Sequence, residues 1–170
     1  MTPRKPESHG KAANGTPLHL RHVAADDGER LRRSLDKLSP EARRQRFLGA
    51  VNSISDAFVR DLTDAPRERQ CTLLVVRREA GEEIPVAGGR FVIGDTPETA
   101  DTCEFALTIG DAWQGQGIGR RLVEAFEEWA LSRGARHVSL TSAMHREQAH
   151  GFYRACGWEA TGLRFARDLG

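Results

Sequence analysis

The spacing of apolar residues predicts helices early in the chain and strands in its middle. Over residues 18–21 apolar and polar side chains alternate, which predicts a first strand. A helix capped by Asp26 or Asp27 is predicted next, because leucines at helical spacing share one of its faces, namely Leu31, Leu35 and Leu38. Ser39-Pro40 and Ser55-Asp56 each mark the start of another short helix.

After residue 69 the hydrophobic period becomes that of strands. The runs 71–76 and 86–93 predict two strands joined by a turn at Gly81, and 105–109 predicts a third. A long helix that ends at Gly134 follows, and its apolar face carries Ile118, Leu122, Phe126 and Trp129. A strand over 138–141 and a helix over 146–156 come next, and two short strands are predicted at 158–161 and 164–169.

This order of elements predicts an α/β fold with one mixed sheet. Three strands in series indicate antiparallel pairing, and the strand–helix–strand of residues 103–142 indicates one parallel crossover. The sheet is therefore expected to be mostly antiparallel, with helices on both faces. Residues 17–170 are expected to form a single domain, and residues 1–16, which are rich in Pro, Gly, Lys and Asn, a flexible tail.

Charge and composition exclude several classes of protein. The chain has 25 basic and 24 acidic residues, which argues against a general nucleic-acid binder. No apolar run approaches the ~20 residues that span a bilayer, and no signal-peptide core is present. We therefore expect a cytoplasmic monomer or homodimer without a membrane or nucleic-acid partner. No metal site is expected, because the three cysteines lack CxxC spacing and His145 and His150 lack a third ligand. Cys71 and Cys103 are predicted to be small buried hydrophobic residues.

The turn before the long helix is the strongest sign of chemistry. Glycines at 115, 117 and 119 remove Cβ atoms, so that backbone N–H groups can approach an anion at the helix N-terminus. Arg120 and Arg121 add positive charge there. The spacing differs from a P-loop, which ends in GK[ST], and from a dinucleotide-binding turn, whose third glycine would stand at position 120. A purely structural glycine turn is the alternative.

Two segments resemble the GNAT superfamily of N-acetyltransferases. Gln114-x-x-Gly117-x-Gly119 is similar to its Q/R-x-x-G-x-G/A signature. Arg146-x-x-Ala149-His150-x-Phe152-Tyr153-x-x-x-Gly157-Trp158 resembles its N-x-x-A-x-x-F-Y-x-x-x-G-F helix, although Arg146 stands where many members carry asparagine. The segments 38–47 and 104–106 also look like the acetyltransferase domain of bacterial protein-lysine acetyltransferases. The resemblance implies a GNAT-type mixed sheet and acetyl transfer to a primary amine by direct attack.

The resemblance also implies roles for particular residues. Acetyl-CoA is the implied co-substrate, and the residues expected to bind it are Leu107, Thr108, Ile109, Gln114, Gly115, Gln116, Gly117, Ile118, Gly119, Arg120, Arg121, Arg146 and Phe152. Glu104 is the implied base, directly or through water, and burial would suit it to accept a proton. Tyr153 is the implied acid toward the leaving thiolate. The alternatives are a surface or capping glutamate and a core aromatic residue.

The acceptor amine is left open by the sequence. A protein lysine is slightly favoured through segment 38–47, and a small amine such as an amino-sugar antibiotic is the other option. The acceptor pocket is expected to draw on residues 26–62 and 94–102. A non-catalytic acyl-CoA sensor is the alternative class, whose mark would be the loss of Glu104 and Tyr153. Another acyl group, such as succinyl, is a third possibility that Arg90 or Arg146 would favour.

Overall fold

The chain folds into two compact units, Met1–Leu140 and Thr141–Gly170. The structure is a computed structural model that describes residues 7–47, 54–63, 68–94, 96–100, 102–142 and 144–162, with the side chains of 44–47 left aside. The first unit holds a sheet and most of the helices. The second unit holds one helix and the segment that follows it.

Six strands lie side by side in sequence order, namely β1 (Ser8–Lys11), β2 (Pro17–His22), β3 (Gln70–Glu79), β4 (Glu82–Ile93), β5 (Thr102–Ile109) and β6 (His137–Ser139). All neighbours are antiparallel except β5 and β6, which are parallel. Two short 3-10 turns are present, η1 (Ala25–Asp27) and η2 (Asp111–Trp113). The mixed, mostly antiparallel sheet that the sequence predicts is confirmed.

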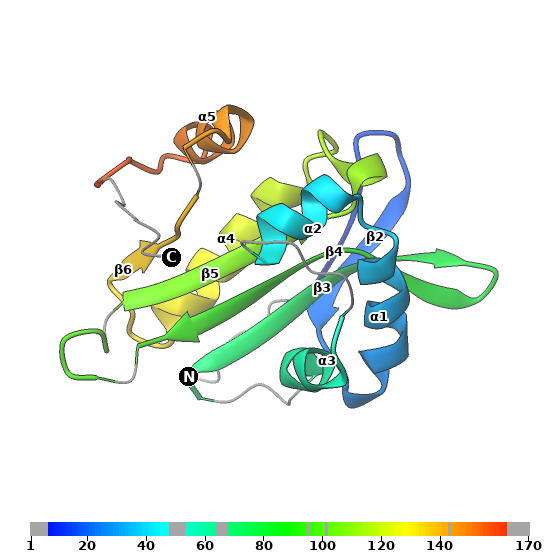
Figure 1. The fold of residues 1–170 in the computed structure, drawn as a ribbon, viewed down its shortest axis with the longest axis horizontal. Coiled ribbons are helices and arrows are strands. Elements are labelled where there is room, and N and C mark those ends of the chain that lie inside the picture. Colours follow the sequence, from blue (N-terminus) through cyan, green and yellow to red (C-terminus); the bar gives the residue numbers. More distant parts are fainter. Residues whose placement is uncertain are drawn as a thin grey trace, which may run out of the picture. The chain divides into compact units, whose positions relative to one another are not determined.

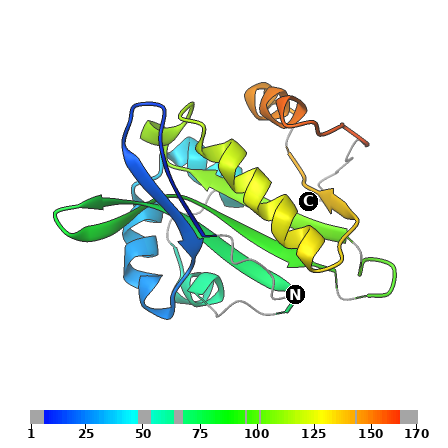
Figure 2. The ribbon, with the colours of Figure 1, turned by 180° about the vertical axis from the view of Figure 1, so that it is seen from behind.

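The helices of the first unit cover both faces of this sheet, as predicted. They are α1 (Gly28–Asp36), α2 (Pro40–Phe47), α3 (Asp56–Thr63) and α4 (Ile118–Ser132). Figure 1 shows α1, α2 and α3 in front of the sheet, and Figure 2 shows α4 lying across its other face. The second unit contains α5 (Glu147–Ala155).

Aromatic packing attaches α4 to the middle of the sheet. Phe126 of α4 lies 4.2 Å from the ring of Phe105 and 4.7 Å from that of Phe91, measured between ring centroids. Trp129 lies 5.8 Å from Phe91. All four residues are buried. Because deleting such a buried ring costs about 3–5 kcal/mol, this cluster holds α4 in place against β4 and β5.

On the other face, a second apolar cluster joins the three early helices to the sheet. It includes the leucines that share one face of α1, together with Val59 and Leu62 of α3, and these pack against Leu74 and Val76 of β3. The leucines that recur at helical spacing in the sequence, Leu31, Leu35 and Leu38, are buried in this cluster. On this face α1 contacts β4 and α2 contacts β5, while α4 contacts both strands on the other face.

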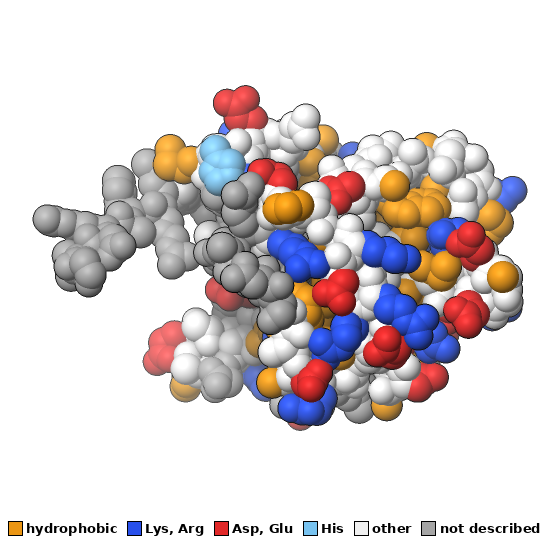
Figure 3. Space-filling model, turned by 45° about the vertical axis from the view of Figure 1, so that its right-hand side comes forward, with side chains coloured by type: hydrophobic (Ala, Val, Ile, Leu, Met, Phe, Trp, Pro, Cys, Tyr) orange, Lys and Arg blue, Asp and Glu red, His pale blue; other side chains and the backbone are white. Residues whose placement is uncertain are grey.

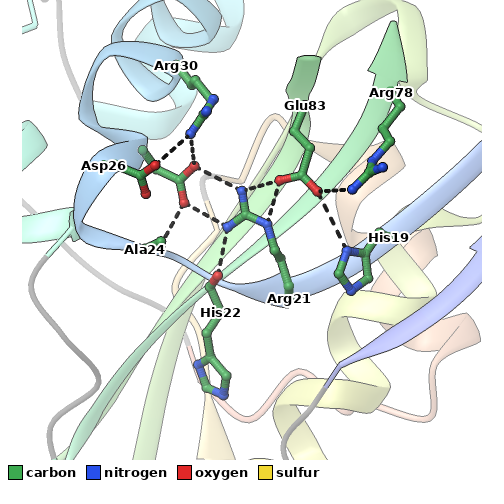
Figure 4. Close-up of polar contacts among 9 residues, drawn as sticks. His19, Arg21, His22, Ala24, Asp26, Arg30, Arg78 and Glu83 are labelled. Atoms are coloured by element: carbon green, nitrogen blue, oxygen red, sulfur yellow. Dashed lines mark hydrogen bonds and ion pairs between the residues drawn. The ribbon is translucent and has the colours of Figure 1, made fainter. Parts of the chain in front are cut away.

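A network of buried charges ties β2 to α1 and to the β3–β4 hairpin (Figure 4). The Asp27 side chain is fully buried, and its two oxygens accept hydrogen bonds from the Arg21 guanidinium at 2.7 and 2.9 Å. Arg21 also donates to Glu83 at 2.7 Å. Burial alone would raise the pKa of Asp27, but the hydrogen bonds from Arg21 and from the Ala24 N–H, with the positive charge of Arg21, hold that pKa below its usual value.

Ion pairs also line the exposed side of α1. Arg33 contacts Glu29 at 3.2 Å and Arg30 contacts Asp26 at 3.5 Å, both one helical turn apart. Figure 3 shows basic and acidic side chains alternating on this side of the molecule. No helix among the residues that the structure describes is long and apolar enough to cross a membrane.

Several predicted elements differ from the structure. Strand β1 lies inside the segment expected to be a flexible tail; its exposed residues pair with β2 through the backbone and therefore show no apolar period. Residues 158–161 contain no strand. The strand predicted at 164–169 lies outside the described residues. The predicted burial of Cys71 and Cys103 is confirmed, since at most 1% of either residue is exposed.

Candidate active site

Strand β5 has an edge that its neighbour β6 covers only in part. The two strands pair at Thr102, Cys103 and Glu104, whereas β5 continues to Ile109 and pairs with β4 along its other edge. No further strand of the described chain pairs with β5 beyond Glu104. The sheet therefore opens between β5 and β6 at the end of β5 that leads into α4.

The direction of the backbone groups along β5 follows from two hydrogen bonds at its ends. The carbonyl of Thr102 accepts from Gly94 at 3.0 Å, and Gly110 N–H donates to Val86 at 2.9 Å, so even-numbered residues point toward β4. Leu107 and Ile109 consequently direct their N–H and C=O groups to the open edge. The Gln114 side-chain amide reaches the Ile109 carbonyl from that side, at 3.5 Å. Thr108, predicted to bind coenzyme, directs its backbone toward β4 instead.

The turn after η2 is open and left-handed at two glycines. Gly115 has φ 71° and Gly117 has φ 80°, a region that favours glycine. A Cβ atom built at either position meets no other atom within 4 Å, so both face open space. Gly117 is the N-cap of α4, which begins at Ile118 without a side-chain cap. The first N–H groups of a helix lack intrahelical partners, and here they follow an open turn.

The N-terminal hairpin holds this turn from one side. The backbone N–H groups of Ala13 and Asn14 donate to the carbonyl and to the side-chain Oε1 of Gln116, at 3.2 and 3.0 Å. Arg121 donates to the hydroxyl and carbonyl oxygens of Ser8, at 3.1 and 3.4 Å. Two residues predicted to bind coenzyme are thus engaged with the β1–β2 hairpin. This contact could not be predicted from the sequence, because β1 carries no periodic apolar pattern.

Glu104 lies on the face of β5 that is turned away from α4. Side chains alternate along the strand, and Phe105 packs on Phe126 of α4, so Glu104 shares the opposite face with Ala106 and Thr108. The expectation that Glu104 is buried, and thereby suited to accept a proton, is wrong, since the residue is exposed. It lies at the last position of the short β5–β6 pairing and is accessible to solvent.

A cavity of about 350 Å³ opens on the same face as Ala106 and Thr108. Helices α1 and α3, strands β3, β4 and β5, and η2 line it. Residues 26–62 contribute Leu31, Leu35, Leu38 and Leu62 to its lining, and none of the described residues of 94–102 lines it; the expected acceptor pocket stays a prediction. The cavity thus begins two strand positions from Glu104, on the same face of β5.

The second unit contains the other predicted residues. Arg146 immediately precedes α5, and the rings of Phe152 and Tyr153 are 5.1 Å apart. Tyr153 also lies 5.8 Å from the Trp158 ring. Burial raises the pKa of the Tyr153 phenol, although the charge of Arg146 opposes this shift. The phenol is therefore protonated at neutral pH, as a proton donor must be.

The described residues include no group of three or more His, Cys, Asp or Glu side chains placed to hold a metal ion. Burial raises the pKa of both Cys71 and Cys103 to about 12, so neither thiol forms an appreciable amount of thiolate at neutral pH. These two cysteines are poor nucleophiles.

The site thus combines an open glycine turn at the N-terminus of α4 with a strand edge that β6 covers only in part. The sequence profile of the acetyltransferase (GNAT) family matches residues 35–158. The chain belongs to this family, whose fold uses acetyl-CoA as co-substrate. It is accordingly a GNAT-type N-acetyltransferase, and the resemblance of its two motifs is confirmed at the level of the family.

Similar proteins fall into the same class. The chain is 30% identical to Acetyltransferase PA5475 of Pseudomonas aeruginosa over 134 residues, 78% of this chain and 70% of that protein. A 49-residue stretch is 43% identical to an aminoglycoside N(6')-acetyltransferase type 1 of Stenotrophomonas maltophilia, covering 29% of this chain and 32% of that one. The crystal structure of the GNAT domain of S. lividans PAT shares the fold, with TM-score 0.82, 24% identity and coverage of 99% and 95%.

Proposed function

We propose that this acetyltransferase binds acetyl-CoA at residues 107–121 and transfers the acetyl group directly to a primary amine that enters beside Glu104. The observation that carries the proposal is the open left-handed turn at Gly115 and Gly117, next to an edge of β5 that β6 leaves uncovered. Both features offer backbone N–H groups, and neither needs a side chain to bind an anion or an amide.

The diphosphate of the coenzyme is assigned to the turn. Its charge is favoured by the positive end of the α4 dipole and by Arg120 in the first helical turn. Arg121, which binds Ser8, supports the turn through the β1–β2 hairpin rather than through a phosphate. The side chain of Gln116 also holds the hairpin, which leaves the backbone N–H groups of the turn as the principal ligands.

The pantetheine arm is assigned to the open edge of β5. Its amides would pair with the backbone groups of Leu107 and Ile109 as a neighbouring strand does. When bound, acetyl-CoA supplies a thioester whose carbonyl is open to attack. The N–H of Leu107 is the candidate donor for the oxygen that becomes negative during attack, because a donor fixed by a strand needs no reorganisation.

The acceptor amine must lose a proton before it can attack. A lysine-type ammonium has a pKa near ~10.4, so a base is needed at neutral pH. Glu104 is our candidate base, and its exposure favours a route through an ordered water molecule. Tyr153 is our candidate acid for the departing thiolate, because its phenol carries a proton at neutral pH; burial, which raises the pKa of the phenol, makes it a weaker donor.

Two similarities favour different classes of acceptor. Segment 38–47 and the similarity to the S. lividans domain favour a protein lysine. The local similarity to an aminoglycoside acetyltransferase favours a small amine. A test must therefore include both classes.

The experiment measures thiol release from acetyl-CoA against a panel of amines, with mass spectrometry of the products. Glu104→Gln should lower kcat by about 10²–10⁴-fold while the dissociation constant of acetyl-CoA stays unchanged. Tyr153→Phe should also lower kcat without a change in that constant. The matched control is Glu124→Gln, which neutralises an exposed carboxylate on α4. Full activity in both the Glu104 and Tyr153 variants would refute the assigned roles.

A further inference from the structure

The cavity beside β5 combines an apolar wall with a polar floor. The wall comes from the leucines of α1, from Leu62 of α3 and from Leu74 of β3. The floor comes from β4 and β5, where the short side chain of Ala106 fills little of the space above the sheet and the Leu74 side chain lies close to Gly88. A ligand that fits must therefore have an apolar body and at least one polar group directed at the strands.

Three polar side-chain atoms of the cavity lining have no hydrogen-bond partner within the described protein. Arg90 Nε, Thr108 Oγ1 and Arg77 Nε are each buried without a hydrogen-bond partner among the described residues, and all three side chains line the cavity. A guanidinium N–H only donates, and a hydroxyl can donate. Because a buried donor without an acceptor is costly, each of these groups calls for an oxygen acceptor from water or from a ligand.

The register of β4 and β5 brings two of these groups close together. Gly88 pairs with Thr108 and Arg90 pairs with Ala106, so Arg90 and Thr108 are diagonal neighbours on one face of the sheet. The Arg90 terminal nitrogen is held by Asp61 at 2.6 Å, which fixes the guanidinium and leaves Nε available. Arg77 lies over the Trp113 ring, 5.7 Å from its centroid, and is held in the same manner by Glu79.

The unpaired donors of the lining, rather than its net charge, favour a ligand with acceptor oxygens. Its charged residues are Lys37, Arg77, Arg90 and Asp111, and the carboxylates of Asp61 and Glu79, which pair with the two arginines, balance the remaining positive charge. Asp111 is engaged, since it accepts hydrogen bonds from the N–H and hydroxyl of Ser39 at 3.1 and 3.3 Å. A carboxylate offers acceptor oxygens to the donors of Arg90 and Thr108, whereas the ammonium groups of a polycationic amino sugar can only donate.

We infer that the acceptor is a small amine with an apolar body and a carboxylate, and that the carboxylate binds to Arg90 and Thr108 while the body packs against α1. The inference rests on the proposed function, because it takes the amine to lie beside Glu104. Arg90 and Thr108 thereby select the acceptor and take no part in the transfer itself. The same donors could instead bind the carboxylate of a larger acyl group, such as succinyl, so the test must separate the two sources.

The test compares two amines that differ only in the carboxylate, 4-(aminomethyl)benzoate and benzylamine, with acetyl-CoA as donor. Kanamycin serves as a polycation and a lysine-containing peptide as a protein-like acceptor. Wild-type protein should show a kcat/KM about tenfold or more higher for the carboxylate amine than for benzylamine. In Arg90→Met and in Thr108→Val this ratio should fall toward one. In the control Arg33→Gln, which alters an exposed arginine outside the cavity, it should not change.

The outcomes separate the inference from the proposed function. Equal rates for the two matched amines in wild-type protein, or a preference for kanamycin or the peptide, would overturn the inference while leaving acetyl transfer intact. A faster reaction of succinyl-CoA with benzylamine than of acetyl-CoA with the carboxylate amine would assign the donors to the acyl group and also overturn it. Failure to bind acetyl-CoA at all, measured by calorimetry, would overturn the proposed function. The wild-type comparison decides the matter even if a variant does not fold.

Discussion

Two glycines at opposite ends of α4 provide a controlled test of the coenzyme site. Gly117 at the N-cap has φ 80°, and Gly134, just after the C-terminus, has φ 82°. A Cβ atom at either position meets no atom within 4 Å. Gly117→Leu and Gly134→Leu therefore impose the same backbone strain and no steric clash with the described protein. They differ only in what lies in the open space beside them.

The cost in stability is the same for both variants. A non-glycine residue in the left-handed region costs about 1–2 kcal/mol. For a protein of this length each kcal/mol lowers Tm by about 2–4 °C, so each variant should melt about 2–8 °C below the wild type. The loss arises from the backbone and involves no buried contact.

The effect on coenzyme affinity should differ between the two variants. In Gly117→Leu the added side chain would occupy space assigned to the diphosphate, and losing one hydrogen bond to a charged group costs about 1.5–3 kcal/mol. The dissociation constant of acetyl-CoA should thus rise about tenfold or more in Gly117→Leu and stay unchanged in Gly134→Leu. Calorimetric titration and thermal denaturation measure the two quantities. Equal affinities in the two variants, at equal loss of Tm, would refute the assignment of the turn.

The buried charges and thiols give three further predictions. Asp27→Asn should lower the free energy of unfolding by about 3 kcal/mol, the lower end for a broken buried pair, because Arg21 keeps Glu83 as a partner; an unchanged urea midpoint would contradict this. Since the pKa of Asp27 is lowered in the folded state, its contribution is present at neutral pH and is lost as pH falls through that pKa, so wild-type and Asp27→Asn stabilities should converge in acid. Burial raises the pKa of Cys71 and Cys103 from 9.0 to about 12, so these thiols ionise at lower pH in the unfolded chain, and the free energy of unfolding should fall as pH rises from 9.0 toward 12. At pH near ~8 a thiol reagent should label the two cysteines only when the protein unfolds. Rapid labelling of the native protein would count against their burial.

The elements that the sequence predicts are those that bury one face. The leucines of α1 and the apolar stripe of α4 recur at helical spacing because each stripe covers one face of the sheet. Strand β1 escaped prediction because its pairing uses the backbone and its side chains are exposed. Segment 158–161 has strand-like composition but no strand in the structure, since composition alone does not supply a pairing partner.

Some features of the candidate site could also be predicted from the sequence, and others could not. The glycine turn could be predicted, because positive φ values restrict the residue type at Gly115 and Gly117. The open edge of β5 could not be derived from residue spacing, because it depends on where β6 ends. The diagonal placement of Arg90 and Thr108 on one face of the sheet could not be derived either, because it depends on the register between β4 and β5. The exposure of Glu104 shows the limit of assigning burial from neighbouring apolar residues.

A crystal structure with coenzyme A bound would test the central claim most directly. We predict diphosphate oxygens within about 2.7–3.2 Å of backbone nitrogens in residues 115–120, and the pantetheine amides paired with the open edge of β5 at Leu107 and Ile109. Coenzyme A bound at another surface, or held at the turn by side chains with its backbone nitrogens turned away, would contradict the account.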